Sequence, residues 1–238
     1  MVSSQRFMDN ATETQGALSR KISTNVWPRY VAVEGPIGVG KTTLASKLAT
    51  VLHYPLMLEP SVENPFLGRF YQEGRRHALP TQLFFLLHRA RQMADLPEHD
   101  LVGPNVVADF LIEKDRLFAQ LTLDNNEYEL YQRIHESLAI APPTPDLVIY
   151  LQAPVNILAG RIRRRGVEFE RDIAEDYLES LVDAYTEFFH FYDDAPLLVV
   201  NAAEIDFANN ADHFEALLDQ ILAMDGLRHY FNPNPTLL

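Results

Sequence analysis

The sequence has 238 residues, of which 47% are hydrophobic and 22% are charged, and it contains no cysteine. This length allows one large α/β domain, and the absence of cysteine excludes disulfides and thiolate metal sites and suits a reducing cytoplasm. The formal net charge of −13 argues against a nucleic-acid partner, because a surface that binds phosphate backbones is basic. No apolar run is long enough to span a bilayer, so we expect no membrane partner.

The predicted elements alternate between strands and helices. Residues 1–26 are rich in Ser, Thr, Asn and Gln, which predicts a disordered N-terminal tail. Short apolar runs without polar alternation then predict buried parallel strands. These runs are Tyr30–Glu34, Leu56–Glu59, Val106–Asp109, Leu147–Leu151 and Leu197–Val200. Helical patterns lie at Thr42–Leu52, Pro80–Leu96, Glu113–Leu121, Glu127–Ala139, Val155–Arg165, Asp176–Tyr192 and Phe207–Ala223. The alternation predicts one doubly wound α/β domain over residues 27–225, with about five parallel strands, followed by a loose tail over 226–238.

The stretch GPIGVGKTT follows the first predicted strand and precedes the first predicted helix. It matches the phosphate loop of P-loop NTPases in the context that this motif requires. The glycines let backbone N–H groups converge on anionic oxygens, the lysine reaches the β- and γ-phosphates, and the first threonine binds Mg²⁺. We therefore expect ATP, with Mg²⁺, to be held by Gly35, Gly38, Gly40, Lys41, Thr42 and Thr43.

Besides the strand before the phosphate loop, two predicted strands end in carboxylates, Glu59 and Asp109. Ligands in open α/β sheets bind outside the carboxyl ends of the strands, so both acids should face the site. Asp109 is placed as the second partner of Mg²⁺, beside Thr42. Glu59 would repel a phosphate but suits a neutral hydroxyl whose proton it can accept. A strand-to-turn aspartate and a surface glutamate before proline are the alternatives for these two residues.

Arg161 and Arg165, in the run RIRRRG, are four residues apart and share a helix face. This pattern indicates a lid that closes on the transferred phosphoryl group and balances its charge. A solvated basic face is the alternative.

Gln82 and Arg89 lie seven residues apart, which places them on one face of a helix. An amide can pair with the edge of a base, and the intervening Phe85 can stack on it. Without further information Gln82 could equally be a surface polar residue, and Tyr71 could be a core aromatic.

These residues, taken together, resemble the deoxynucleoside kinases, in particular the deoxycytidine, deoxyguanosine and deoxyadenosine kinase group, from about Arg29 to Asp194. The resemblance places Glu59, in EPSVENP, at the catalytic glutamate and Arg161 and Arg165 in the lid. It implies that Tyr71 and Glu170 bind the sugar. It further implies that Gln82 and Arg89 meet the base, that Asp115 partners Arg89, and that the protein is a homodimer with nucleoside triphosphates as donors.

The sequence departs from this family after the third strand. The family usually has an acid-Arg-Ser triplet there, whereas this chain has Asp109-Phe110-Leu111. The acid is kept and the arginine is lost, so a lid arginine is the candidate for its role.

The sequence therefore predicts a salvage enzyme that transfers the γ-phosphoryl group of ATP to the 5′-hydroxyl of a deoxyribonucleoside. Deoxyadenosine, deoxyguanosine or deoxycytidine is the expected acceptor, with a purine slightly ahead, because a thymine methyl group would press toward Arg89. The alternatives are a thymidylate-type nucleotide kinase and a P-loop switch that binds nucleotide without acting as a kinase.

Overall fold

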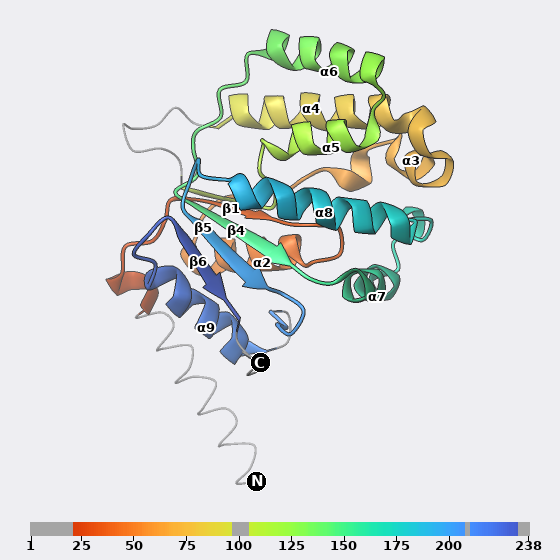
Figure 1. Ribbon diagram of the computed structural model, residues 1–238. Helices are drawn as coiled ribbons and strands as arrows, with labels where there is room; N and C mark the ends of the chain where they lie inside the picture. The colour runs from red at the N-terminus through yellow and green to blue at the C-terminus, as the bar shows by residue number, and fades with distance from the viewer. Residues whose placement is uncertain (1–20, 97–104, 208–209, 233–238) are drawn as a thin grey trace.

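The computed structural model describes residues 21–96, 105–207 and 210–232, and its centre is a sheet of parallel strands (Figure 1). The strand order is β2-β3-β1-β4-β5-β6, so β1 lies inside the sheet. From β1 the chain crosses to β2 at one edge and returns to β3, and it then moves outward on the other side through β4, β5 and β6. The strands are β1 Tyr30–Glu34, β2 Leu56–Met57, β3 Val106–Ala108, β4 Leu147–Gln152, β5 Leu197–Asn201 and β6 Arg228–Phe231. The predicted doubly wound fold is confirmed. The segment that follows β1 lies at the point where the winding reverses, which is where such sheets bind ligands.

Helices cover both faces of the sheet because the buried strands present apolar side chains to each side. Val31 and Val33 of β1 pack toward α2 (Lys41–Leu52) and α9 (Ala211–Leu222). Tyr30 and Ala32 point the other way, toward α5 (Lys114–Thr122) and α8 (Glu175–Phe191). Figure 1 shows these two layers on opposite sides of the strands.

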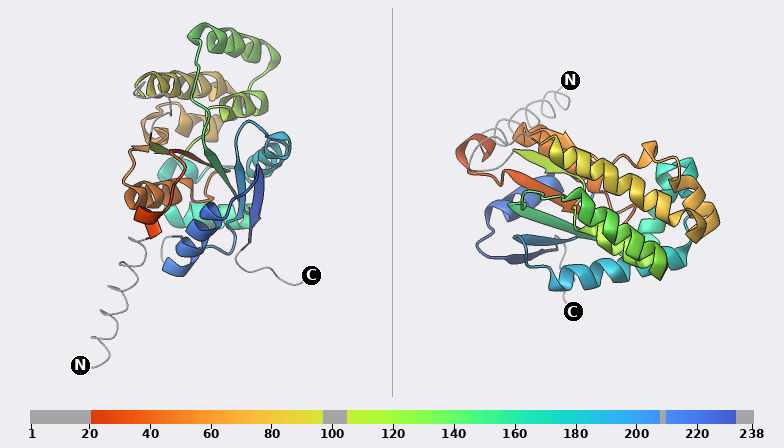
Figure 2. Two further views of the ribbon diagram at one scale, coloured as in Figure 1. Left: turned by 90° about the vertical axis from the view of Figure 1, so that its left-hand side faces the viewer. Right: turned by 90° about the horizontal axis from the view of Figure 1, so that it is seen from above.

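A further group of helices lies above the α5 side of the sheet. It consists of α3 (Leu67–Glu73), α4 (Ala78–Ala94) and α6 (Asn125–Leu138), which share a separate apolar cluster around Phe70, Leu86 and Tyr131. Seen from above, α4 and α6 run side by side over the sheet (Figure 2). The helix α7 (Val155–Arg165), the predicted lid, follows β4 and has the bounds that the sequence predicted. No helix in the described ranges is both long and apolar enough to cross a membrane.

Both predicted tails are partly ordered. Residues 228–231 were expected to be loose but form β6, whose register pairs Leu197 of β5 with Arg228. Residues 21–24 were assigned to a disordered segment but are helical, and Ile22 packs on the core and accepts a hydrogen bond from Trp27. The rest of the two predicted tails, residues 1–20 and 233–238, lies outside the described residues.

Candidate active site

The phosphate loop connects the buried strand β1 to α2 through glycines that no other residue could replace without strain. Gly35 has φ of +147°, and a Cβ built there would lie 2.3 Å from the carbonyl oxygen of Leu151. Gly40 precedes α2 with φ of +111°, in the left-handed region that side chains disfavour. Because Gly40 has no side chain that could cap α2, the backbone N–H groups at the start of the helix are available to an anion.

Lys41 is the first residue of α2, and its ammonium group lies against the loop. Its Nζ donates hydrogen bonds to the carbonyl oxygens of Gly35, at 2.7 Å, and Pro36, at 3.3 Å. Burial lowers the pKa of Lys41, and the nearby charge of Lys114 lowers it further. An incoming phosphate would supply the negative charge that these carbonyl groups only partly provide.

Asp109 links the phosphate loop to the strand-end acid Glu59. One of its carboxylate oxygens accepts a hydrogen bond from the Thr42 hydroxyl at 2.6 Å, and the other accepts one from the backbone N–H of Glu59 at 2.7 Å. Burial raises the pKa of Asp109, although these hydrogen bonds oppose the rise.

The oxygen donors beside the phosphate loop fit Mg²⁺. Within the described ranges, no three or more His, Cys, Asp or Glu side chains gather as a metal site. Mg²⁺ is commonly held by one or two protein oxygens together with water and substrate phosphates, which suits the adjacent Thr42 hydroxyl and Asp109 carboxylate.

Glu59 lies two residues beyond the end of β2 rather than within the strand, as had been predicted. Its side chain is 19% exposed and forms ion pairs with Arg89 and, at 3.0 Å, with Lys114. Burial alone would raise the pKa of Glu59, but the charges of Arg89, Lys114 and Lys41 hold it well below its usual range. Glu59 is therefore an ionised acceptor fixed in place by cations.

Gln82 and Arg89 share a face of α4, as their spacing predicted, and both are buried at 3% exposure. The amide of Gln82 donates to the Thr122 hydroxyl at 3.2 Å, so Gln82 is an interior residue and not a surface one. The guanidinium of Arg89 lies between Asp115 and Glu59 and forms ion pairs with both. Arg89 therefore reaches the strand-end carboxylate as well as its expected partner.

The predicted sugar-binding residues come together at the end of the lid. Arg165 of α7 forms an ion pair with Glu170, and its Nε donates to that carboxylate at 3.0 Å. Tyr71 of α3 stacks on Phe169, with the ring centroids 6.5 Å apart and an interplanar angle of 9°. The end of the lid thus closes against α3.

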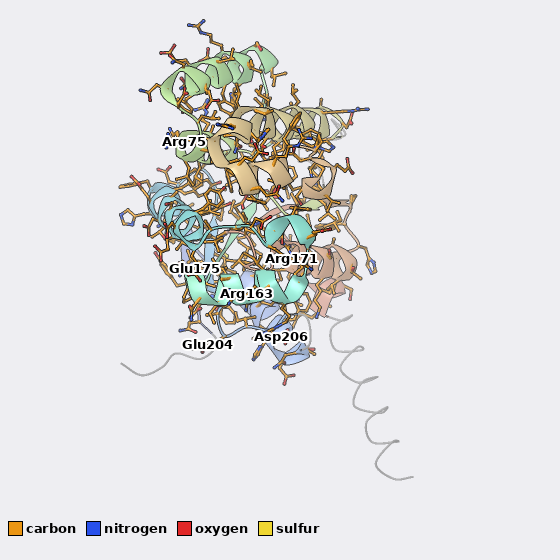
Figure 3. The ribbon with its side chains drawn as sticks, turned by 90° about the vertical axis from the view of Figure 1, so that its right-hand side faces the viewer. Arg75, Arg163, Arg171, Glu175, Glu204 and Asp206 are labelled. Carbon is orange, nitrogen blue, oxygen red and sulfur yellow. The ribbon has the colours of Figure 1, made fainter. Side chains whose placement is uncertain are left out.

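Arg161 lies apart from Arg165 despite the shared helix. Its guanidinium donates to the carbonyl oxygens of Val39, at 3.0 Å, and Ala202, at 2.7 Å, and so ties the phosphate loop to the segment after β5. That segment also carries Glu204 and Asp206, which lie near α7 and its exposed Arg163 in Figure 3. The two lid arginines therefore have different partners.

One cavity joins most of the predicted residues. Its lining includes Gly38, Lys41, Thr42, Glu59, Tyr71, Gln82, Arg89, Asp109, Arg165 and Glu170. A second, open cavity on the other side of the loop is lined by Gly40, Thr43 and Arg161, among others. Asp115 lines neither of these two cavities and lies behind Arg89, while Gly35 forms the buried base of the loop. The first cavity thus runs from the phosphate loop to Gln82 and Arg89.

Residues 31–224 match the family profile described as deoxynucleoside kinase. The chain belongs to the deoxynucleoside kinase family. Membership supports the interpretation as an ATP-dependent deoxynucleoside kinase over a thymidylate-type kinase or a non-kinase switch.

Relatives of this family cover most of the chain. A deoxyguanosine kinase of Bacillus subtilis is 36% identical over 79% of this chain and 93% of its own length. A deoxyadenosine/deoxycytidine kinase of the same organism is 29% identical over 82% and 92%. The structure of a deoxyadenosine kinase from M. mycoides with bound dATP is similar with a TM-score of 0.70, at 26% identity over 81% of this chain and 98% of that one.

Sequence reasoning missed two charged residues of this kinase site. Lys114, the first residue of α5, lines the cavity, and Glu34, the last residue of β1, lies beneath it. The available signal was a lysine directly before Asp115, at the start of the predicted helix Glu113–Leu121. Phe110, which replaces the family arginine, is fully buried and packs beneath the guanidinium of Arg89, 5.7 Å from the ring centroid.

Proposed function

We propose that this kinase phosphorylates the 5′-hydroxyl of a purine deoxynucleoside, or of deoxycytidine, with Glu59 as the group that receives the hydroxyl proton. The observation that carries the proposal is the single cavity that extends from the phosphate loop, past Glu59, to Gln82 and Arg89. A donor phosphate at Lys41 and a base at Gln82 would place the sugar hydroxyl beside the carboxylate.

The proposed transfer balances as follows. The hydroxyl proton passes to the carboxylate of Glu59, the hydroxyl oxygen bonds to the γ-phosphorus, and the bond from that phosphorus to the bridging oxygen breaks to release ADP. The low pKa of Glu59 does not argue against this role, because phosphoryl transfer has a loose transition state in which positioning outweighs basicity. Lys41 and Arg165 would balance charge on the transferred group.

Mg²⁺ is part of this proposal, held by the Thr42 hydroxyl and Asp109 together with the donor phosphates. When bound, it would neutralise charge that develops on the β- and γ-phosphate oxygens.

The acceptor preference rests on the base end of the cavity. The Gln82 amide, oriented by Thr122, can pair with a base edge that carries both a donor and an acceptor. Arg89, held between Asp115 and Glu59, lines this end of the cavity with a charged group, which disfavours the methyl group of thymine. Relatives named for deoxyguanosine and deoxyadenosine support the choice of a purine.

We also propose that the protein forms a homodimer and lies in the cytoplasm. The dimer is implied by the family resemblance and is consistent with the exposed Phe191 on α8, which is 73% exposed. Light scattering coupled to size-exclusion chromatography would measure the assembly, and cell fractionation would test the location.

The test is a panel of the four common deoxynucleosides with ATP and Mg²⁺, read by chromatography of the monophosphate products. We expect the highest kcat/KM for deoxyadenosine or deoxyguanosine, then deoxycytidine, and the lowest for thymidine. The variant Glu59→Gln should lower kcat by about 10²–10⁴-fold while ATP binding stays near the wild-type value.

Two controls distinguish the competing enzymes. Thymidine monophosphate as acceptor tests the nucleotide kinase, and ATP hydrolysis without acceptor tests the switch. A preference for thymidine or its monophosphate, or full turnover by Glu59→Gln, would contradict the proposal.

A further inference from the structure

Lys114 is a buried cation at the reacting end of the cavity. Its side chain is 2% exposed, and its Nζ lies 3.0 Å from a carboxylate oxygen of Glu59 and 3.4 Å from one of Glu34. A lysine is rarely buried unless it is paired, so its position requires these two acids. The side chain also lies against the rings of Phe110 and Phe118, at 5.9 and 6.0 Å from their centroids.

Glu34 anchors Lys114 from below. It is fully buried, and its carboxylate accepts hydrogen bonds from the backbone N–H groups of Gly35, at 2.8 Å, and Leu111, at 2.7 Å. The hydroxyl of Tyr185 donates a third, at 2.9 Å. A carboxylate with this many fixed donors is held in one place, so Glu34 gives Lys114 a fixed anchor below the cavity in addition to Glu59.

The family that this chain resembles usually has a positively charged arginine at the position of Phe110. In this chain the ring of Phe110 is buried and carries no charge. Lys114 stands four residues further along, with its ammonium group on the catalytic carboxylate. Neither lid arginine forms an ion pair with Glu59 among the described residues: Arg161 holds backbone carbonyls, and Arg165, proposed to balance charge on the transferred group, is paired with Glu170.

We infer that Lys114 replaces the family arginine, as the positioning residue that holds Glu59 toward the acceptor hydroxyl. The inference rests on the proposed function. During transfer the hydroxyl proton goes to Glu59, and the ammonium group of Lys114 keeps the carboxylate aligned and offsets negative charge near the attacking oxygen. The ionisable side chains around this point are Glu34, Lys41, Glu59, Tyr71, Arg89, Asp109, Asp115 and Tyr185.

The test compares two neutral variants, Lys114→Met and Lys114→Gln, with Lys114→Arg, which keeps the charge. Thermal unfolding selects the more stable neutral variant for kinetics, because glutamine can still hydrogen bond to both carboxylates if methionine is poorly tolerated. Lys47→Met is the matched control. Lys47 lies on α2 with its Nζ 5.5 Å above the ring of Phe214, on the opposite side of the sheet.

We expect the neutral variant to lose roughly 10- to 100-fold in kcat, somewhat less than the loss of an oxyanion donor, with little change in the KM of the nucleoside. Lys114→Arg should recover kcat, because it restores the positive charge beside Glu59, and Lys47→Met should match the wild type.

The outcomes separate the two proposals. If the wild-type protein phosphorylates no deoxynucleoside, the proposed function fails and this inference falls with it. If the wild type is active but the neutral variant keeps its kcat, only the role of Lys114 is overturned. The same holds if Lys114→Arg loses as much kcat as the neutral variant does, or if the neutral variant raises the KM of the nucleoside and leaves kcat unchanged.

Discussion

At the scale of single residues, Asp115 holds Arg89, the residue proposed to meet the base. Its side chain is fully buried, and burial raises its pKa to about 6 even though Arg89 lowers it. One of its carboxylate oxygens pairs with Arg89, while the other has no hydrogen-bond partner within the described part of the chain. As pH falls through about 6, Asp115 takes up a proton and loses the charge that holds Arg89.

We therefore expect the KM of the nucleoside to rise as pH falls from about 7.5 to about 5, because the guanidinium loses one of its two anchors. Asp115→Asn should show the high KM at every pH, since the amide cannot ionise. Initial rates at several pH values measure this, with the KM of ATP as the internal control. A nucleoside KM that stays constant with pH in the wild type would show that Asp115 does not titrate in this range.

At the scale of elements, α7 distributes its arginines between two tasks. Arg161 holds the carbonyls of Val39 and Ala202, which is a structural link behind the phosphate loop. Arg165, whose side chain is 48% exposed, lines the cavity and is held by Glu170. Of these two arginines, only Arg165 has a guanidinium edge available to a transferred phosphoryl group.

Arg165→Ala should consequently lower kcat by at least about tenfold, equivalent to about 1.4 kcal/mol. Arg161→Ala should instead lower the melting temperature and weaken ATP binding, because the loop loses its hold on the segment after β5. The matched control is Arg163→Ala. Arg163 is exposed on the same helix (Figure 3), so this variant should leave kcat, the melting temperature and ATP binding unchanged. Equal kinetics for all three variants would mean that α7 contributes only a solvated basic face.

At the scale of the whole molecule, the strands β1 to β5 were predictable from the sequence, whereas β6 and the short helix α3 were not. The runs YVAVE and LVIYL are apolar throughout because both faces of their strands are covered, and such runs identify a parallel sheet. The run RHYF of β6 is only partly buried and pairs on one side, so it has no comparable signal. The short helix α3 was missed for the same reason, since its burial depends on α4 and α6.

The site also contains some features that the local sequence predicts and others that it does not. The phosphate loop and the spacing of Gln82 and Arg89 follow from local sequence, because a loop motif and one helix face are local properties. The pairing of Lys114 with Glu34 and Glu59 joins residues that are distant in the chain, and no local pattern records it. The contact between Arg89 and Glu59 was missed for that reason as well.

Asp109 belongs to both halves of the site, since it accepts one hydrogen bond from Thr42 and one from the backbone of Glu59. We therefore expect a coupling free energy between ATP, proposed to bind beside Thr42, and the nucleoside, proposed to bind beside Glu59. Reciprocity requires that ATP tighten the nucleoside by the same factor as the nucleoside tightens ATP, and couplings of this kind are typically about 5- to 150-fold. Calorimetric titrations with a non-hydrolysable ATP analogue, made in both orders, should give equal factors well above one. Asp109→Asn should bring both factors close to one, because an amide has a single accepting oxygen and can keep only one of the two hydrogen bonds, either that of Thr42 or that of Glu59. If the variant kept the wild-type factors, the communication between donor and acceptor would have to run through another part of the kinase.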